Sequence, residues 1–341
     1  MTDRVDRARR IAAEVDQLDD AQLRALVDNA RTVGVGIGGT TKVGTINGEP
    51  VFIKYLPVPR SEENDPYSTV DRLSLPFVSH YGIGSLGHGV GRELAAHRMT
   101  SEWVQTGKAD FFPLLFGSRI LDLHCDIDLS EFDGEGPRRQ WGPYWHQLTK
   151  NLQELKSATA GVVLLLEYVP ETLGAQLRRR IGDGAGEPVV ADAVHQIVEA
   201  TEWMNAEGFH HFDVHPGNTL VHEGRLLFTD FGLSLHHEFE LTVDEKASLP
   251  VHAGFDRDSG LMHLFHWVLF ELGFTSEPER MALLRAASQS NAPELEPVRT
   301  ALGESADLIS HYAEVAVDMT EMFSVLMEDV SAASYSYGQA H

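Results

Sequence analysis

Between His211 and Leu235 the chain reads HFDVHPGNTLVHEGRLLFTDFGLSL, with acidic and amide side chains among apolar runs. Asp213 and Asn218 stand five positions apart, and Asp230 follows directly on the run LLFT. A charge beside such runs is unfavourable unless a cation or a chemical task compensates for it. The stretch therefore predicts two short strands, joined by a turn at 222–224, with functional polar residues at their ends.

A glycine-rich segment upstream, VGVGIGGTTKVGTINGEPVFIKYL, adds a second constraint. Its glycines fit G-x-G-x-x-G, but a dinucleotide-binding unit would require a helix directly afterwards. The Asn-Gly pair at 47–48 instead predicts a β-hairpin. The glycines are thus either a flap over phosphates or an ordinary turn. Lys54 lies in the apolar strand that follows, where it either points to water or pairs with an acid such as Glu93.

The order of segments predicts a strand-rich part followed by a helix-rich part, with the border near residue 170. Helical spacing covers 4–30, and a further helix is expected at 90–105. The stretches 58–90 and 118–160 have the character of insertions. We therefore expect an N-terminal helical extension at 1–30, a sheet-containing lobe at 31–169 and a helical lobe at 170–341.

Composition restricts the class of protein. The formal net charge is −24, from 27 basic and 51 acidic side chains, which disfavours binding to nucleic acid. The acidic balance is typical of a soluble surface, with attraction of a cationic substrate as the alternative. One cysteine, Cys125, rules out an intramolecular disulfide. The first 20 residues lack the apolar core of a signal peptide and no apolar run reaches membrane-spanning length, so we expect a cytoplasmic protein without a membrane partner.

Together these motifs resemble the protein-kinase-like superfamily over residues 30–270. The glycine hairpin, Lys54, Glu93, the H-x-D-x-x-x-x-N pattern from His211 to Asn218 and the D-F-G triplet from Asp230 occur in that family's order. The resemblance implies an α+β, bilobal protein-kinase-like fold. Its N-lobe would be a small antiparallel β-sheet with one helix, and its C-lobe would be larger and mainly helical.

The resemblance also implies roles for individual residues. The glycine hairpin would cover the ATP phosphates, and Lys54, oriented by Glu93, would hold the α- and β-phosphates. Asp213 would be the catalytic base toward a hydroxyl, and Mg²⁺ would be held by Asn218 and Asp230. The implied catalytic residues are Asp213 and Lys54, the implied metal ligands are Asn218 and Asp230, and the implied nucleotide-binding residues are Gly34, Gly36, Gly38, Gly39, Lys54, Glu93, Glu167 and Val169.

The motif form favours one branch of the superfamily. Protein kinases usually carry lysine two residues after the catalytic aspartate, whereas this chain has His215, and D-x-H-P-G-N resembles aminoglycoside and other small-molecule phosphotransferases. No A-P-E sequence follows D-F-G. The expected function is ATP-dependent phosphoryl transfer to a hydroxyl of an antibiotic or metabolite, with antibiotic resistance as one possible role. The alternatives are a Ser/Thr protein kinase and a nucleotide-binding pseudokinase. The protein kinase is favoured by D-F-G-L and by the stretch RDSGLMHLFHWVLFELG, which resembles the buried anchoring helix of a protein-kinase C-lobe with Asp258 as its anchoring aspartate.

Two further features admit alternative interpretations. The histidines at 210, 211 and 215 are either a transition-metal site or structural, with His211 as the family's loop-packing histidine. The aromatic residues at 141, 144 and 145 either stack on an acceptor or belong to the core. The methionine-rich helix near the C-terminus is expected to be core or an oligomer seam.

Overall fold

The computed structural model describes residues 2–84, 86–289 and 293–335, and the chain divides into two compact units. The first unit contains the residues up to Val169 together with Asp230–Lys246. The second contains Pro170–Thr229 and the residues from Ala247 onward. The segment that begins with the D-F-G triplet therefore packs with the sheet-containing unit, although it follows the first helices of the second unit in sequence.

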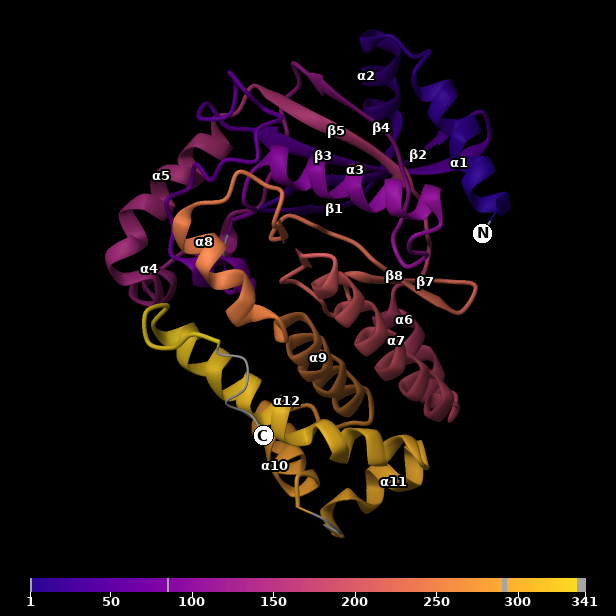
Figure 1. Cartoon of the computed structure of the whole chain (residues 1–341), viewed down its shortest axis with the longest axis vertical. Coiled ribbons are helices and arrows are strands. Elements are labelled where there is room, and N and C mark those ends of the chain that lie inside the picture. The colour runs from indigo at the N-terminus through magenta and orange to yellow at the C-terminus, as the bar shows by residue number, and fades with distance from the viewer. Residues whose placement is uncertain (1, 85, 290–292, 336–341) are drawn as a thin grey trace. The chain divides into compact units, whose positions relative to one another are not determined.

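The first unit is built on a five-stranded antiparallel sheet with strand order β1-β2-β3-β5-β4 (Figure 1). Asn47 and Gly48 both have positive φ, at 47° and 86°, as a two-residue turn between twisted strands requires. The hairpin predicted from this pair is thus confirmed. The strands are β1 (Arg31–Gly36), β2 (Gly39–Ile46), β3 (Glu49–Val58), β4 (Leu115–Leu121) and β5 (Ala160–Glu167).

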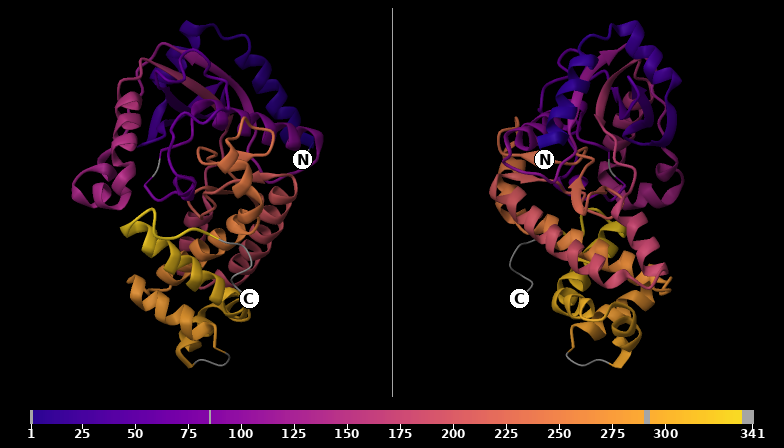
Figure 2. Two further views of the ribbon diagram at one scale, coloured as in Figure 1. Left: turned by 60° about the vertical axis from the view of Figure 1, so that its left-hand side comes forward. Right: turned by 90° about the vertical axis from the view of Figure 1, so that its right-hand side faces the viewer.

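Helices cover both faces of this sheet. This explains why consecutive side chains of β3, which point to opposite faces, are both buried. Leu56 packs toward α3 (Val90–Thr106), in a cluster that includes Leu94. Ile53 faces the opposite side and lies near Leu26 of α2 (Asp20–Asn29). Helix α1 (Thr2–Val15) contacts β2 and β4 (Figures 1 and 2). The N-terminal extension therefore completes the core of the first unit.

The insertion between β4 and β5 contributes two more helices, so the sheet is accompanied by more than the single helix expected. They are α4 (Glu135–Trp141) and α5 (Trp145–Lys156), and α5 contacts β3. Trp141 is fully buried, which agrees with the core interpretation of that residue. A short helix, α8 (Val243–Ser248), ends the D-F-G segment.

The second unit is mainly helical. Its centre is α9 (Phe255–Glu271), which contacts α7 (Gly186–Ala206) and α12 (Ser305–Glu328). Met319 of α12 is buried, as expected for a core methionine, whereas Met327 is exposed. The two strands predicted around the turn at 222–224 are present and pair as a hairpin. The remaining elements are α6 (Leu173–Gly182), β7 (Thr219–His222), β8 (Arg225–Phe228), α10 (Glu277–Ala287) and α11 (Glu296–Leu302).

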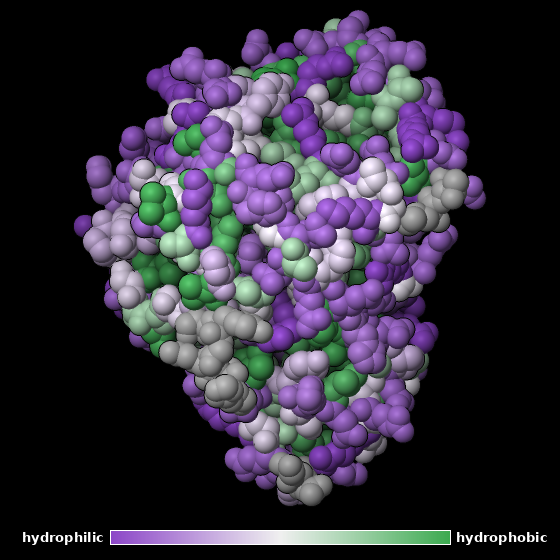
Figure 3. All heavy atoms as spheres, in the orientation of Figure 1, coloured by the Kyte–Doolittle hydropathy of each residue, from purple (hydrophilic) through white to green (hydrophobic). Residues whose placement is uncertain are grey.

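The surface is mainly hydrophilic on the face drawn in Figure 3. Hydrophobic side chains occur on this face in small, separate groups. None of the helices in the described part of the chain combines the length and the apolar character needed to cross a membrane.

Candidate functional site

Lys54, Glu93 and Asp230 meet inside the first unit. Lys54 is 8% exposed, and its Nζ lies 2.6 Å from Oε1 of Glu93 and 2.7 Å from Oδ1 of Asp230. The three residues come from the middle of β3, the first turn of α3 and the start of the D-F-G segment. Lys54 is therefore paired with acidic residues and does not point to water.

The electrostatics of this group favour a charged lysine. Burial alone would lower the pKa of Lys54, but the carboxylates of Asp230 and Glu93 outweigh it and raise the pKa above its usual value. The two acids differ in accessibility, because the side chain of Glu93 is 6% exposed and that of Asp230 is 45% exposed. Glu93 is therefore suited to position Lys54, whereas Asp230 remains accessible to a ligand from solvent.

A second buried ion pair ties α3 to the D-F-G segment. Arg92 is 1% exposed, and its Nη1 and Nη2 donate to Oε1 and Oε2 of Glu245 at 2.6 and 3.1 Å. Arg92 Nε also donates to the carbonyl of Thr69. Burial would raise the pKa of Glu245, but hydrogen bonds from His80 and Arg92 hold it well below its usual value. This pair was not found from the sequence, because 153 residues separate its members.

The glycine hairpin consists of β1, β2 and the turn at 37–38 between them, and it contacts both β3 and the residues that follow β4. Gly39 has φ of 124°, and a Cβ there would lie 2.0 Å from the carbonyl oxygen of Tyr55, so only glycine fits. The carbonyl of Gly36 accepts from Asp128 N, and Thr40 Oγ1 donates to the carbonyl of Asp126. The start of the 118–160 insertion thus runs along the hairpin. Gly34 lies on β1, Gly36 ends that strand, and Gly38 is exposed in the turn.

Glu167, one of the implied nucleotide-binding residues, makes contacts at the end of β5 through both its backbone and its side chain. Its backbone N–H donates to the carbonyl of Leu114, and its carboxylate accepts from Nε and Nη2 of Arg4 at 2.8 and 2.6 Å. The side chain therefore anchors helix α1 against the end of β5. Val169, the last residue of this part of the first unit, is buried at 8% exposure.

Asp213 and Asn218 lie together in the second unit. Asn218 Nδ2 donates to Oδ2 of Asp213 at 2.7 Å, and its backbone N–H donates to the carbonyl of His215. His215 Nε2 is 3.8 Å from Oδ1 of Asp213, and its Nδ1 accepts from Gly217 N. The imidazole thus stands beside the carboxylate at the position where protein kinases usually carry lysine.

His211 has a structural role in this loop. Its ring is fully buried, with Nδ1 accepting from Asp213 N and Nε2 at 3.1 Å from the carbonyl of Thr229. One ring nitrogen therefore holds the backbone of Asp213, and the other links this loop to Thr229. Among the residues that the structure describes, no group of three or more His, Cys, Asp or Glu side chains is arranged to hold a metal ion.

The anchoring aspartate of the helix after the loop is Asp256 and not Asp258, the residue named from the sequence. Asp256 is 5% exposed and accepts from the backbone N–H groups of His211 and Phe212, both at 2.7 Å. Burial raises its pKa to about 6, although the two hydrogen bonds act in the opposite direction. Asp258 instead pairs with Arg257 and accepts from the hydroxyl of Tyr335.

Two residues of these loops have an unusual backbone conformation. Phe212 has φ of 63° and Asp230 has φ of 69°, in the left-handed region that non-glycine residues seldom adopt. Phe212 is held there by Asp256 and by its own burial. Such strain is retained where the surroundings over-determine it, and it is often found at functional sites. The sequence offered a partial signal, since Phe212 departs from the residue usual in the related families.

The polar groups fit a magnesium–nucleotide ligand in their chemistry. Asn218 uses its amide N–H₂ on Asp213, which leaves the carbonyl oxygen as the end able to bind a cation. Asp230 offers a half-exposed carboxylate, and hard oxygens of both kinds suit Mg²⁺. Lys54 supplies a buried, permanently charged ammonium of the kind that binds phosphate. The first unit holds Lys54, Glu93 and Asp230, and the second holds Asp213 and Asn218.

Comparison with known proteins gives one relevant similarity. No protein-family model matches the chain. A stretch of 162 residues is 30% identical to the CBL-interacting serine/threonine-protein kinase 12 of Arabidopsis thaliana. The match covers 46% of this chain and 30% of that kinase, so the chain spans under a third of the relative's length. The match supports a protein-kinase-like relationship and, in general terms, a kinase or phosphotransferase role.

Proposed function

We propose that the chain is an ATP-dependent phosphotransferase that moves the γ-phosphate to a hydroxyl of a small molecule. The observation that carries the proposal is the buried lysine on β3, held between a buried glutamate on α3 and the half-exposed Asp230. One acid, Glu93, would be enough to neutralise Lys54 in a purely structural ion pair. The second acid, Asp230, is accessible to solvent, and a metal ion that binds phosphate oxygens requires such a carboxylate.

In this proposal each residue has one task. Lys54, positioned by Glu93, binds the α- and β-phosphates through its charge. Asp230 and Asn218 hold Mg²⁺, which neutralises charge on the phosphate oxygens when it is bound. Asp213 accepts the proton of the acceptor hydroxyl, and His211 and Asp256 fix the backbone on which Asp213 stands.

The acceptor class is proposed from the loop and from the charge. The imidazole of His215, 3.8 Å from Asp213, replaces the lysine usual in protein kinases, and the chain has the D-x-H-P-G-N form of small-molecule phosphotransferases. The net charge of −24 suits a cationic acceptor such as an amino sugar or an amino alcohol. The second candidate, a Ser/Thr protein kinase, is favoured by the partial similarity to the plant serine/threonine-protein kinase.

Transfer of label from γ-labelled ATP tests the proposal. The protein is incubated with hydroxylated aminoglycosides and amino alcohols in one arm, and with a generic protein substrate and itself in the other. We expect Mg²⁺-dependent labelling of a small acceptor, and loss by several orders of magnitude in Asp213→Asn, which keeps the size of the side chain. Label on protein alone would favour the second candidate. Nucleotide binding without any transfer, or full activity of Asp213→Asn, would contradict an enzymatic role for this loop.

A further inference from the structure

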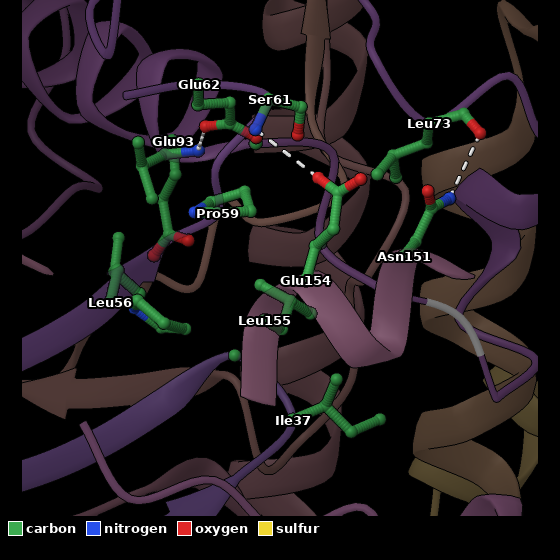
Figure 4. Close-up of a pocket in the computed structure, with 15 residues that line it drawn as sticks. Ile37, Leu56, Pro59, Ser61, Glu62, Leu73, Glu93, Asn151, Glu154 and Leu155 are labelled. Atoms are coloured by element: carbon green, nitrogen blue, oxygen red, sulfur yellow. Dashed lines mark hydrogen bonds between the residues drawn. The ribbon is translucent and has the colours of Figure 1, made fainter. Parts of the chain in front are cut away.

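A pocket lies within the first unit at the tip of the glycine hairpin. Its walls are the hairpin tip, the end of β3, the segment 59–62, the start of α3 and helix α5 of the insertion (Figure 4). The space inside, including the part open to solvent, is about 520 Å³.

The pocket combines an apolar lining with acidic groups. Ile37, Leu56 and Leu155 contribute apolar walls from the hairpin, β3 and α5. Among the described residues that line the pocket, three are glutamates and none is a lysine or an arginine. An apolar body with a cationic group would therefore complement it, whereas an anion would not.

The three glutamates are not equivalent. Glu93 is neutralised by Lys54, and Glu62 accepts from Val90 N at the start of α3. Glu154 is half-buried and accepts only a long hydrogen bond, 3.3 Å, from Ser61 N. Figure 4 shows its second carboxylate oxygen directed away from Ser61. Burial raises the pKa of Glu62, the Val90 hydrogen bond and the charges of Arg72 and Arg92 act in the opposite direction, and the charge of Glu154 adds a smaller upward contribution. A cation at Glu154 would relieve that repulsion.

We propose that this pocket binds a small organic cation whose ammonium pairs with Glu154 and whose apolar body packs on Leu155 and Ile37. The site goes beyond the proposed phosphotransferase activity because its α5 wall belongs to the insertion, while Gly38 and Glu93 of the implied nucleotide-binding set form the adjoining wall. An occupant contacts both the hairpin tip and the first turn of α3, which carries Glu93. Occupancy therefore holds the two elements that position Lys54 and cover the phosphates, and the pocket is a modulator site.

Titration with three probes of matched shape tests the site on the full chain without nucleotide. The probes are phenethylamine, phenethyl alcohol and phenylacetate, and binding is followed by NMR of the backbone amides. Phenethylamine has no hydroxyl and cannot be a phosphate acceptor, so the result is independent of the proposed function. We expect it to saturate the protein, with shifts at 37–38, 87–93 and 151–155, and to bind about tenfold more tightly than the alcohol.

Variants assign the charge and the shape separately. Glu154→Gln removes the charge and Leu155→Trp fills the space, and each should weaken phenethylamine binding about tenfold or more. The control is Glu135→Gln on α4, whose side chain is 90% exposed, and it should leave the affinity within about twofold. Circular dichroism checks folding of each variant. Absence of saturable binding, shifts outside these segments, or equal binding of amine and alcohol would overturn the proposal, as would an unchanged affinity in Glu154→Gln.

Discussion

Replacing Lys54 by methionine tests the electrostatics of the buried group. The substitution keeps the length and apolar stem of the side chain but removes the charge between two acids. The side chain of Glu93, at 6% exposure, would be left as a buried carboxylate without its cation. Removing one partner of a buried ion pair costs about 3–5 kcal/mol. Asp230 is half-exposed and can be hydrated when Lys54 is removed, so its lost ion pair adds little to this cost.

The stability cost of Lys54→Met can be compared with the costs of two related variants. Glu93→Gln leaves Lys54 paired with Asp230 at 2.7 Å, so we expect a loss of only about 1–2 kcal/mol. The double variant Lys54→Met with Glu93→Leu removes both charges, and an apolar pair of similar volume often restores stability. The double variant should therefore be more stable than Lys54→Met alone by about 2 kcal/mol or more.

Urea denaturation followed by circular dichroism gives the free energies of unfolding. The expected order of stability is wild type, Glu93→Gln, the double variant, and last Lys54→Met. Equal stability of Lys54→Met and Glu93→Gln would refute the reasoning, because it would mean that Glu93 is not held as a buried charge. A double variant less stable than Lys54→Met would refute it as well.

Three further changes have defined outcomes. His266 accepts a hydrogen bond on Nδ1 from Arg280, and burial followed by the charge of Arg280 lowers the pKa of His266 to about 4. Its contribution to stability is present above pH 6.5 and is lost as the pH falls toward 4. Urea denaturation should therefore show that wild type loses about 2 kcal/mol more between pH 7 and pH 5 than His266→Gln does. Arg92→Ala leaves Glu245 buried without its cation, so it should lower the free energy of unfolding by about 3–5 kcal/mol. Limited proteolysis should then cleave 230–246 faster than in wild type, and unchanged protease resistance would contradict this. Gly39→Ala should lower stability by about 2–4 kcal/mol because its Cβ meets a backbone carbonyl, whereas Gly38→Ala, in open space, should change it by under about 0.5 kcal/mol.

Local signals made much of the first unit predictable. The Asn-Gly pair specified the β2–β3 turn through its positive φ values, and the apolar runs specified β3 and β5. The position of Lys54 in an apolar strand allowed either water or an acidic partner such as Glu93, and the structure shows Lys54 paired with Glu93 and Asp230. These inferences succeeded because each rests on a few neighbouring residues or on a charge that must be compensated.

Contacts between distant residues could not be predicted in the same way. Arg4 and Glu167 are 163 positions apart, and nothing local to either residue indicates the other. Asp256 and Asp258 both lie in the first turn of one helix, and only the fold shows which one reaches the backbone of the loop. The pocket beside α5 likewise depends on how the insertion folds back on the sheet, which its irregular sequence pattern does not specify.

Equilibrium binding of ATP with and without Mg²⁺ is the most direct test of the central proposal, that Lys54 and Asp230 belong to a magnesium–nucleotide site. Calorimetric titration of wild type, Asp230→Asn and Lys54→Met gives the three affinities. We expect Mg²⁺-dependent binding in wild type and a loss of about tenfold or more in each variant, since each removes a charged contact to the phosphates or the metal. Wild-type affinity for ATP in both variants, or equal ATP binding by wild type with and without Mg²⁺, would contradict the proposal.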